Sequence, residues 1–445
     1  MIADPLVLAV VLIGVMFLFL LSSIWIGVSL FLTGIFGMLI YDHHLPPAIS
    51  IINKIGNLLA GSIFDSLNSW SLAALPMFIL MGEILHYSSI SSKLFNGLVP
   101  WLSKVPGRLL HINVAACSLF AAVSGSSAAT TATVGKITLA ELNKRGYSKS
   151  LALGSLAGSG TLGFLIPPSI IMIIYGVLAD VSIGKLFIAG ILPGLMLATA
   201  YSCYIMVVAT VNKNVVPATL ESFTWEERLN ALKELVPVLL LIMVVIGSIY
   251  GGFATPTEAA SLGVLFSVIL AIYFKSFSFA ILKMSLANTI KTTVMISFII
   301  AGAGFLSQVV GFLGIARALS EFIAALGLTP LMLIVVVAIM YIILGMMLDG
   351  ISMVVMTLPI VLPIITLAGF EPLWFGIFLV FMVEMSQITP PVGFSLFVIQ
   401  SISGESIGYI IKATFPFFLI MILITAVVTF FPEIVFYLPN QMIGK

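Results

Sequence analysis

The sequence predicts an all-α polytopic membrane protein, an inverted repeat with two re-entrant hairpins and two broken helices. Of its 445 residues, 61% are hydrophobic and only 8% are charged, whereas roughly 25% are charged in a typical soluble domain. Apolar runs of about 20 residues, the length that crosses a bilayer, recur along the chain. Small polar clusters and proline pairs interrupt these runs at two places about half a chain apart.

The first apolar run, residues 6–41, is too long for one upright span and forms either two spans or one steeply tilted span. Prolines and charge make residues 42–47 a loop. Residues 49–65 are amphipathic and suit the membrane interface. The next run, 72–85, carries Glu83, which lies either close to an interface or toward a polar interior.

A re-entrant hairpin is predicted over residues 109–142. Its apolar legs, 109–123 and 131–142, are each shorter than the roughly 17 residues that a span needs, and they flank the small polar cluster 124–130. The outer ends carry basic residues, which favour the cytoplasm: Lys104, Arg108, Lys144, Arg145 and Lys149. The hairpin therefore enters from the cytoplasm and turns in mid-membrane. The alternative is one continuous helix weakened by small residues.

Helix breakers at residues 159–169 interrupt the following apolar segment, 151–179. In hydrocarbon every backbone N–H and C=O must be paired, so non-helical chain survives there only where protein or a water-filled cavity surrounds it. Such a break commonly marks a binding site in transporters. The alternative is a proline kink between packed helices.

A further span at about 186–209 is followed by the polar stretch 212–234, whose charges have a helical spacing. We expect this stretch to be an amphipathic helix on the membrane surface. It would join two halves of similar length, residues 1–211 and 235–445.

The second half repeats the features of the first. A second hairpin is predicted over 331–368 with its tip at Asp349–Ser352, and a second broken helix over 373–400 is interrupted at 384–393. Ser126 and Pro167 are 41 residues apart, and so are Asp349 and Pro390, which places both features at an offset of 223.

Charge indicates that the second repeat is inverted. Seven Lys or Arg residues lie from Lys93 to Lys149, but none lies between Arg317 and Lys412, so the two hairpins open to opposite sides. Inverted repeats are the architecture of many secondary transporters, in which paired broken helices meet near the midplane. Helix ends there offer N–H groups to anions and carbonyl groups to cations. Hydroxyl and carbonyl oxygens at the tips suit a hard cation such as sodium.

Other function classes lack their motifs in this sequence. Cys117 and Cys203 form neither a metal pattern nor a disulfide framework. Walker and dinucleotide fingerprints are absent, and a net charge of +1 offers no field for nucleic acid. Ser126 with His111 is unsupported as a nucleophile and base. The sequence therefore indicates neither an enzyme nor a cofactor.

Four motifs together resemble the large membrane subunit of the tripartite ATP-independent periplasmic (TRAP) transporters. They are GSSAATTAT at 125–133, GTLGFLIPPS at 160–169, MTLPIVLP at 356–363 and ITPPVG at 388–393, and residues 75–83 match as well. The resemblance covers essentially the whole chain.

The resemblance implies sodium-coupled uptake of a small organic anion, a carboxylate such as a C4-dicarboxylate or a sugar acid, across the bacterial inner membrane. The anion is delivered by a periplasmic substrate-binding protein. A small four-helix membrane subunit is expected as a separate chain in the lipid bilayer. The implied mechanism is an elevator, in which the hairpins and broken helices move against a scaffold.

By position, the resemblance places binding residues at both tips and both breaks, with sodium near Ser126, Gly160, Asp349 and Thr389. The expected substrate- and ion-binding residues are Ser124, Gly125, Ser126, Ser127, Thr130, Gly160, Thr161, Gly163, Pro167, Pro168, Asp349, Gly350, Ser352, Ser386, Gln387, Thr389, Pro390, Pro391 and Gly393. Several relatives carry Asn or Pro in the first tip, where this chain has Ser127 and Ala128. Asp349 and Glu384 are the carboxylates near the second site, and each either binds a cation or caps a helix end or loop.

Two alternatives remain. A stand-alone divalent-anion/sodium symporter shares the hairpins and the Thr-Pro-Pro style but needs no binding protein. A proton-translocating respiratory subunit needs a row of Lys, Glu and His inside its spans, and most basic residues here fall in loops.

Overall fold

The computed structural model describes residues 4–41, 51–217, 223–391 and 393–442, and within these ranges it is helical and has no β-strand. Eight helical stretches of the described chain are long and apolar enough to cross a membrane, one of them the interrupted stretch Lys149–Leu178, and shorter apolar helices accompany them. The predicted all-α membrane fold is confirmed. The predicted loop at 42–47 lies outside the described residues.

The helices before the first hairpin are α1 (Pro5–Leu21), α2 (Ile26–Tyr41), α3 (Ile51–Leu67), the 3-10 turn η2 (Trp70–Ala73), α4 (Ala74–Tyr87) and α5 (Ile90–Leu102). The long run at 6–41 therefore forms two helices, and the chain turns between them near Ser23, whose φ is 60°. In α4, Glu83 accepts a hydrogen bond at 3.0 Å from Nδ2 of Asn288. Glu83 thus faces a polar group on a neighbouring helix.

The first hairpin consists of α6 (His111–Ser124) and α7 (Ser127–Lys144), preceded by the turn η3 (Arg108–Leu110). Gly125 ends α6 in the left-handed region with a φ of 62°, a conformation that glycine adopts without steric cost. The side chain of Ser126 then caps α7 by accepting a hydrogen bond from Ala129 N. The alternative of one continuous helix is wrong.

The first broken helix has three pieces, α8 (Lys149–Gly160), α9 (Leu162–Leu165) and α10 (Ile170–Leu178). The backbone is extended at Ile166, and Ser169 caps α10 by accepting a hydrogen bond from Met172 N. A new N-cap requires a true helix end, so this segment is interrupted and not merely kinked.

The connection between the halves corrects the sequence prediction. It contains α11 (Ile183–Val211), η4 (Lys213–Val215), α12 (Trp225–Tyr250), α13 (Pro256–Tyr273) and α14 (Phe279–Phe312). No separate surface helix covers the described part of 212–234. A capping box of Thr224 and Glu227 starts α12, and its polar first turns continue into an apolar, membrane-length helix. The charges mark the exposed beginning of α12.

The remaining helices are α15 (Ile315–Ala325), α16 (Pro330–Gly345), α17 (Gly350–Leu367), α18 (Pro372–Gln387), α19 (Phe394–Ser403), α20 (Ile407–Phe430), α21 (Glu433–Phe436) and the turn η5 (Pro439–Gln441). Helix α17 covers the residue range of α7 displaced by 223 positions, and α18 begins 223 positions after α8. Cis peptide bonds join Pro167 to Pro168 and Pro390 to Pro391, again 223 apart. The repeat therefore extends from the sequence to the backbone.

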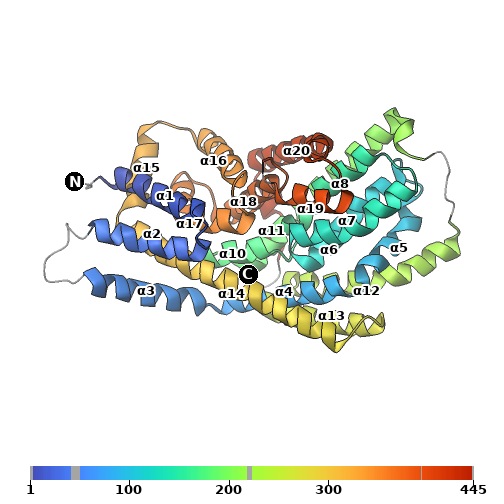
Figure 1. Ribbon diagram of the computed structural model, residues 1–445, viewed down its shortest axis with the longest axis horizontal. Helices are drawn as coiled ribbons and strands as arrows, with labels where there is room; N and C mark the ends of the chain where they lie inside the picture. The colour runs from blue at the N-terminus through green and yellow to red at the C-terminus, as the bar shows by residue number, and fades with distance from the viewer. Residues whose placement is uncertain (1–3, 42–50, 218–222, 392, 443–445) are drawn as a thin grey trace.

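Figure 1 shows two groups of helices. Helix α14 runs along the length of the molecule, and α2, α3 and α4 pack against it; α13 packs on α4, and α12 packs on α5 and α13. The hairpins and broken helices form the other group, which meets α14 through α17 and α10. The most buried segments, α8 to α10 and α18, lie in this second group.

Candidate functional site at the hairpin tips and helix breaks

The first hairpin tip rests directly on the first helix break. The carbonyl of Gly125 accepts a hydrogen bond at 3.3 Å from the N–H of Ile170, at the start of α10. A Cβ on Gly125 would lie 2.8 Å from the carbonyl oxygen of Pro168. Pro167 and Pro168 are both buried. The tip therefore pairs backbone that the interrupted helix would otherwise leave without a partner.

Two glycines of the break let α7 approach closely, Gly163 against the backbone of Ser127 and Gly160 against the side chain of Thr131. A Cβ on Gly163 would lie 2.5 Å from both Cα and N of Ser127, and a Cβ on Gly160 would lie 2.1 Å from Oγ1 of Thr131. No such side chain fits without moving α7. The Thr131 hydroxyl is buried and has no hydrogen-bond partner among the described residues, so an unpaired oxygen lies beside the break.

Hydroxyl groups surround this contact. Oγ of Ser124 and Oγ1 of Thr130 lie 2.8 Å apart. Oγ1 of Thr161 donates to the carbonyl of Gly158 at 2.7 Å. Ser126, half-buried, turns its side chain to the start of α7. These neutral oxygen ligands are of the kind that hard cations prefer.

Glu384 of α18 joins the two repeats. It is fully buried, yet within the described chain its carboxylate accepts hydrogen bonds only from the first repeat. Oε2 accepts a hydrogen bond at 2.9 Å from Oγ of Ser127, and Oε1 accepts one at 2.7 Å from the backbone N–H of Phe164. Oγ of Ser127 also lies 3.1 Å from the carbonyl of Thr161. One carboxylate therefore holds the hairpin tip and the break together.

The sequence predicts only part of this arrangement. Glu384 is noticeable in the sequence because it is a carboxylate inside an apolar run. Of its two proposed roles, cation binding and capping, the structure shows capping, because its oxygens accept hydrogen bonds from the Ser127 hydroxyl and the Phe164 N–H. Phe164 and Thr131 lie inside the motifs at 160–169 and 125–133 but are not among the predicted site residues, because a backbone N–H and a helix-facing hydroxyl leave no pattern of their own.

The second break is built differently. Oγ of Ser386 donates to the carbonyl of Val383 at 2.6 Å, and Oγ1 of Thr389 donates to the carbonyl of Met385 at 2.6 Å. These side chains return to their own helix and close α18. A Cβ on Gly345 would lie 2.1 Å from Cβ of Ser386, so the second hairpin also touches its break closely.

The second tip is capped by a carboxylate. Asp349, exposed, accepts hydrogen bonds from the N–H groups of Ile351 and Ser352, at 3.1 and 3.2 Å, and from the Ser352 hydroxyl. A Cβ on Gly350 would lie 2.4 Å from Cγ1 of Val383. Of the two alternatives for Asp349, the helix-capping contact is present.

The predicted site residues fall into two groups, each a hairpin tip on the break of its own repeat. The first contains Ser124, Gly125, Ser126, Ser127, Thr130, Gly160, Thr161, Gly163, Pro167 and Pro168; the second contains Asp349, Gly350, Ser352, Ser386, Gln387, Thr389, Pro390, Pro391 and Gly393. Val392, inside the ITPPVG motif, lies outside the described residues. Across the repeats, α19 packs on α7 and α10 packs on α17.

Inverted repeats with paired hairpins and interrupted helices define a membrane-embedded secondary transporter subunit. The chain belongs to the family described as "Tripartite ATP-independent periplasmic transporter, DctM component", whose family model matches residues 13–434. It is thus a multi-pass inner-membrane permease subunit and not an enzyme.

Relatives with different named solutes are similar to the chain. The C4-dicarboxylate TRAP transporter large permease protein of Pseudomonas aeruginosa is 34% identical, covering 86% of this chain and 90% of that protein. The ectoine TRAP transporter large permease protein of Halomonas elongata is 33% identical, covering 83% and 86%. The sialic acid TRAP transporter large permease protein of Vibrio cholerae is 26% identical, covering 88% and 92%.

A solved structure supports the fold. The crystal structure of the YdaH transporter of Alcanivorax borkumensis matches with a TM-score of 0.66, covering 93% of this chain and 98% of that chain at 10% sequence identity. At this identity the likeness concerns the fold alone.

Proposed function

We propose that this chain is the large permease subunit of a sodium-coupled transporter that takes up a small organic anion. A periplasmic substrate-binding protein delivers the anion, and a separate small membrane subunit of four helices completes the complex. The observation that carries the proposal is the contact of each hairpin tip with a helix break, repeated at an offset of 223 in a member of this family.

The anion is proposed to be a carboxylate, such as a C4-dicarboxylate or a sugar acid. The relatives are named for a C4-dicarboxylate, for ectoine and for sialic acid, and all these solutes carry a carboxylate group. Identities of 34% and 33% to the first two do not distinguish between their solutes. The shared chemical group is therefore the part of the substrate that we propose here.

Sodium is proposed to bind near Ser126 and Gly160 in the first repeat and near Asp349 and Thr389 in the second. The first group offers hydroxyl oxygens and the buried, unpartnered oxygen of Thr131. Such ligands suit a hard monovalent cation better than a transition metal.

We further propose an elevator motion, in which the group of hairpins and broken helices moves against the group of helices around α14. A cavity of about 400 Å³ lies between the two groups, lined among others by Gly304 of α14, Leu178 of α10 and Pro359 of α17. Incomplete packing at this boundary favours sliding there over sliding within the tightly packed tip and break contacts.

The test is uptake of radiolabelled dicarboxylates and sialic acid into proteoliposomes that contain the chain with its two partner proteins. Uptake should require an inward sodium gradient and the binding protein. Replacing Ser126 or Thr389 with Trp should abolish sodium-dependent uptake in protein that still elutes as a folded species. Unchanged uptake in both variants would refute the site, and robust uptake by this chain alone would instead support the stand-alone symporter.

A further inference from the structure

A small basic pocket lies at the outer end of the first hairpin, away from both tips. Its volume is about 290 Å³, and its lining includes Ser103, Arg108, Lys144, Arg145, Tyr147 and Pro217. None of the described residues that line it is acidic. It thus brings three cationic side chains to one cavity.

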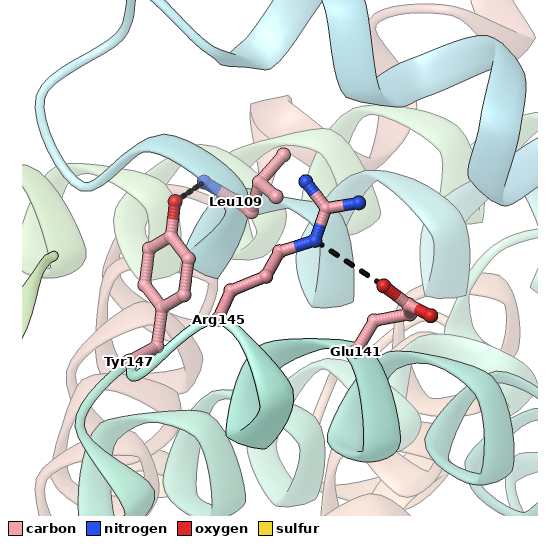
Figure 2. A network of polar contacts seen from close by, with 4 residues as sticks. All are labelled: Leu109, Glu141, Arg145 and Tyr147. Atoms are coloured by element: carbon pink, nitrogen blue, oxygen red, sulfur yellow. Dashed lines mark hydrogen bonds and ion pairs between the residues drawn. The ribbon is translucent and has the colours of Figure 1, made fainter. Parts of the chain in front are cut away.

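Hydrogen bonds orient two of these side chains, Arg108 and Arg145. Nη1 of Arg108 donates to the carbonyl of Pro217 at 2.6 Å, which ties the start of the hairpin to the segment after η4. Nε of Arg145 donates to Oε2 of Glu141 at 3.2 Å, so its guanidinium is oriented by its inner edge. Figure 2 shows this pair beside Tyr147, whose hydroxyl accepts a hydrogen bond from Leu109 N at 3.4 Å.

The backbone at the pocket is unusual as well. Arg108 has a φ of 49°, directly after Gly107 with a φ of 97°. A left-handed conformation is uncommon for a residue with a long side chain and costs free energy. This conformation places Arg108 in the pocket lining.

The chemistry of the pocket matches a phosphate group. Arginine presents a planar fork of donors that fits phosphate oxygens, and lysine adds a compact positive charge. The volume is near the lower limit of small-molecule pockets, about 300 Å³, so it suits a head group and not a large ligand. The basic residues there also predict the cytoplasmic side, where anionic lipids attract clustered Lys and Arg.

We propose that this pocket binds a phosphate group at the cytoplasmic membrane surface, and that a lipid head group is the source its position favours. Binding there would tie the base of the first hairpin to the segment after η4. The proposal is independent of which solute is transported.

The test measures ligand-induced stabilisation of the purified full-length chain in neutral detergent. Short-chain phosphatidylglycerol should raise Tm saturably, and short-chain phosphatidylcholine should not. Lys144→Gln should weaken the apparent affinity about fivefold, the usual effect of one basic residue at a lipid surface. Lys104→Gln is the matched control, because Lys104 is exposed, basic and outside the pocket; its affinity should stay at the wild-type value.

Further arms separate the sources of the phosphate group. Stabilisation by inorganic phosphate but not by lipid, lost in Lys144→Gln, would support the pocket with a soluble ligand. Equal weakening in Lys104→Gln and Lys144→Gln would overturn the proposal in favour of diffuse surface charge. Equal stabilisation by succinate would overturn it in favour of a carboxylate site. Transport is not measured, so these results do not depend on the proposed function.

Discussion

The two helix breaks share a sequence pattern and a backbone course but differ in their surroundings. Pro167 and Pro168 are buried, whereas Pro390 and Pro391 are exposed. The first break is bound by Glu384 from the other repeat, while the hydroxyl groups of Ser386 and Thr389 at the second break donate to carbonyls of their own helix. A duplicated backbone has thus acquired one enclosed break and one open break.

One part of this difference, the binding of the first break from the other repeat, lies in a single pair of equivalent positions. Glu384 stands 223 positions after Thr161, so a carboxylate in one repeat corresponds to a hydroxyl in the other. Only the longer acidic side chain reaches the opposite repeat. The repeat thus positions both breaks, while single side chains determine how firmly each is held.

The first prediction concerns the opposite orientation of the two repeats in the membrane. With Cys203→Ser removing the exposed cysteine and Cys117 buried, Lys144→Cys and Glu371→Cys should react with a membrane-impermeant maleimide from opposite sides. Right-side-out and inside-out vesicles distinguish the two. Labelling of both positions from the same side would refute the inverted orientation of the two repeats.

The next effect tests the carboxylate that joins the repeats. Glu384→Ala leaves the buried N–H of Phe164 without an acceptor, leaves the Ser127 hydroxyl only the carbonyl of Thr161, and opens a cavity in the core. Together these losses should lower the free energy of unfolding by roughly 3–5 kcal/mol. Uptake should be lost with it. Glu384→Gln keeps one acceptor oxygen and should lose less. Equilibrium unfolding in mixed micelles measures both variants.

Glu371→Ala is the matched control for these variants. Glu371 is exposed and immediately precedes the same helix, α18, and its side chain makes no capping hydrogen bond. The free energy of unfolding of this control should stay within about 0.5 kcal/mol of the wild-type value. A Glu384→Ala variant as stable as this control would show that the first break is not held by the second repeat.

The sequence predicts the repeat well because its signals are violations of the surrounding pattern. Glycine, proline and serine inside apolar runs mark the tips and breaks, and two pairs of landmarks at one offset relate them. The helices confirm this with α7 and α17 at the same displacement.

What the sequence does not predict is contact across long separations. Ser127 and Glu384 are 257 residues apart, and nothing local connects them. The predicted surface helix at 212–234 is wrong for a related reason, since the charges at 225–234 have the spacing of a surface helix but belong to the first turns of the longer helix α12. Exposure of Pro390 and Pro391 likewise depends on which helices pack nearby.

A smaller effect compares the close approach of tip and break in the two repeats. Gly163→Ala forces a Cβ against backbone atoms of Ser127, and Gly345→Ala forces one against Cβ of Ser386. Each should cost about 1–3 kcal/mol, as overpacking usually does. Gly408→Ala, with nothing within 4 Å, should be neutral or slightly stabilising. If the free energy of unfolding of Gly163→Ala equalled that of Gly408→Ala, the first tip would not be in close contact with its break.

The last prediction, with the smallest effect on stability, tests whether Asp349 in the second repeat only caps α17 or also binds sodium. Asp349→Ala removes the cap of α17 and should cost about 1 kcal/mol. Asp349→Asn keeps an acceptor oxygen for the N–H groups of Ile351 and Ser352, so its stability should stay within a few tenths of a kcal/mol. If Asp349 also binds sodium, Asp349→Asn should raise the sodium concentration that gives half-maximal uptake, because the removed charge is the one that attracts the cation. Ser126→Asp places the same acidic cap at the start of α7. Its sodium dependence is compared with that of the wild type. An unchanged sodium dependence in Asp349→Asn would limit Asp349 to capping and leave sodium binding in the second repeat to other oxygens.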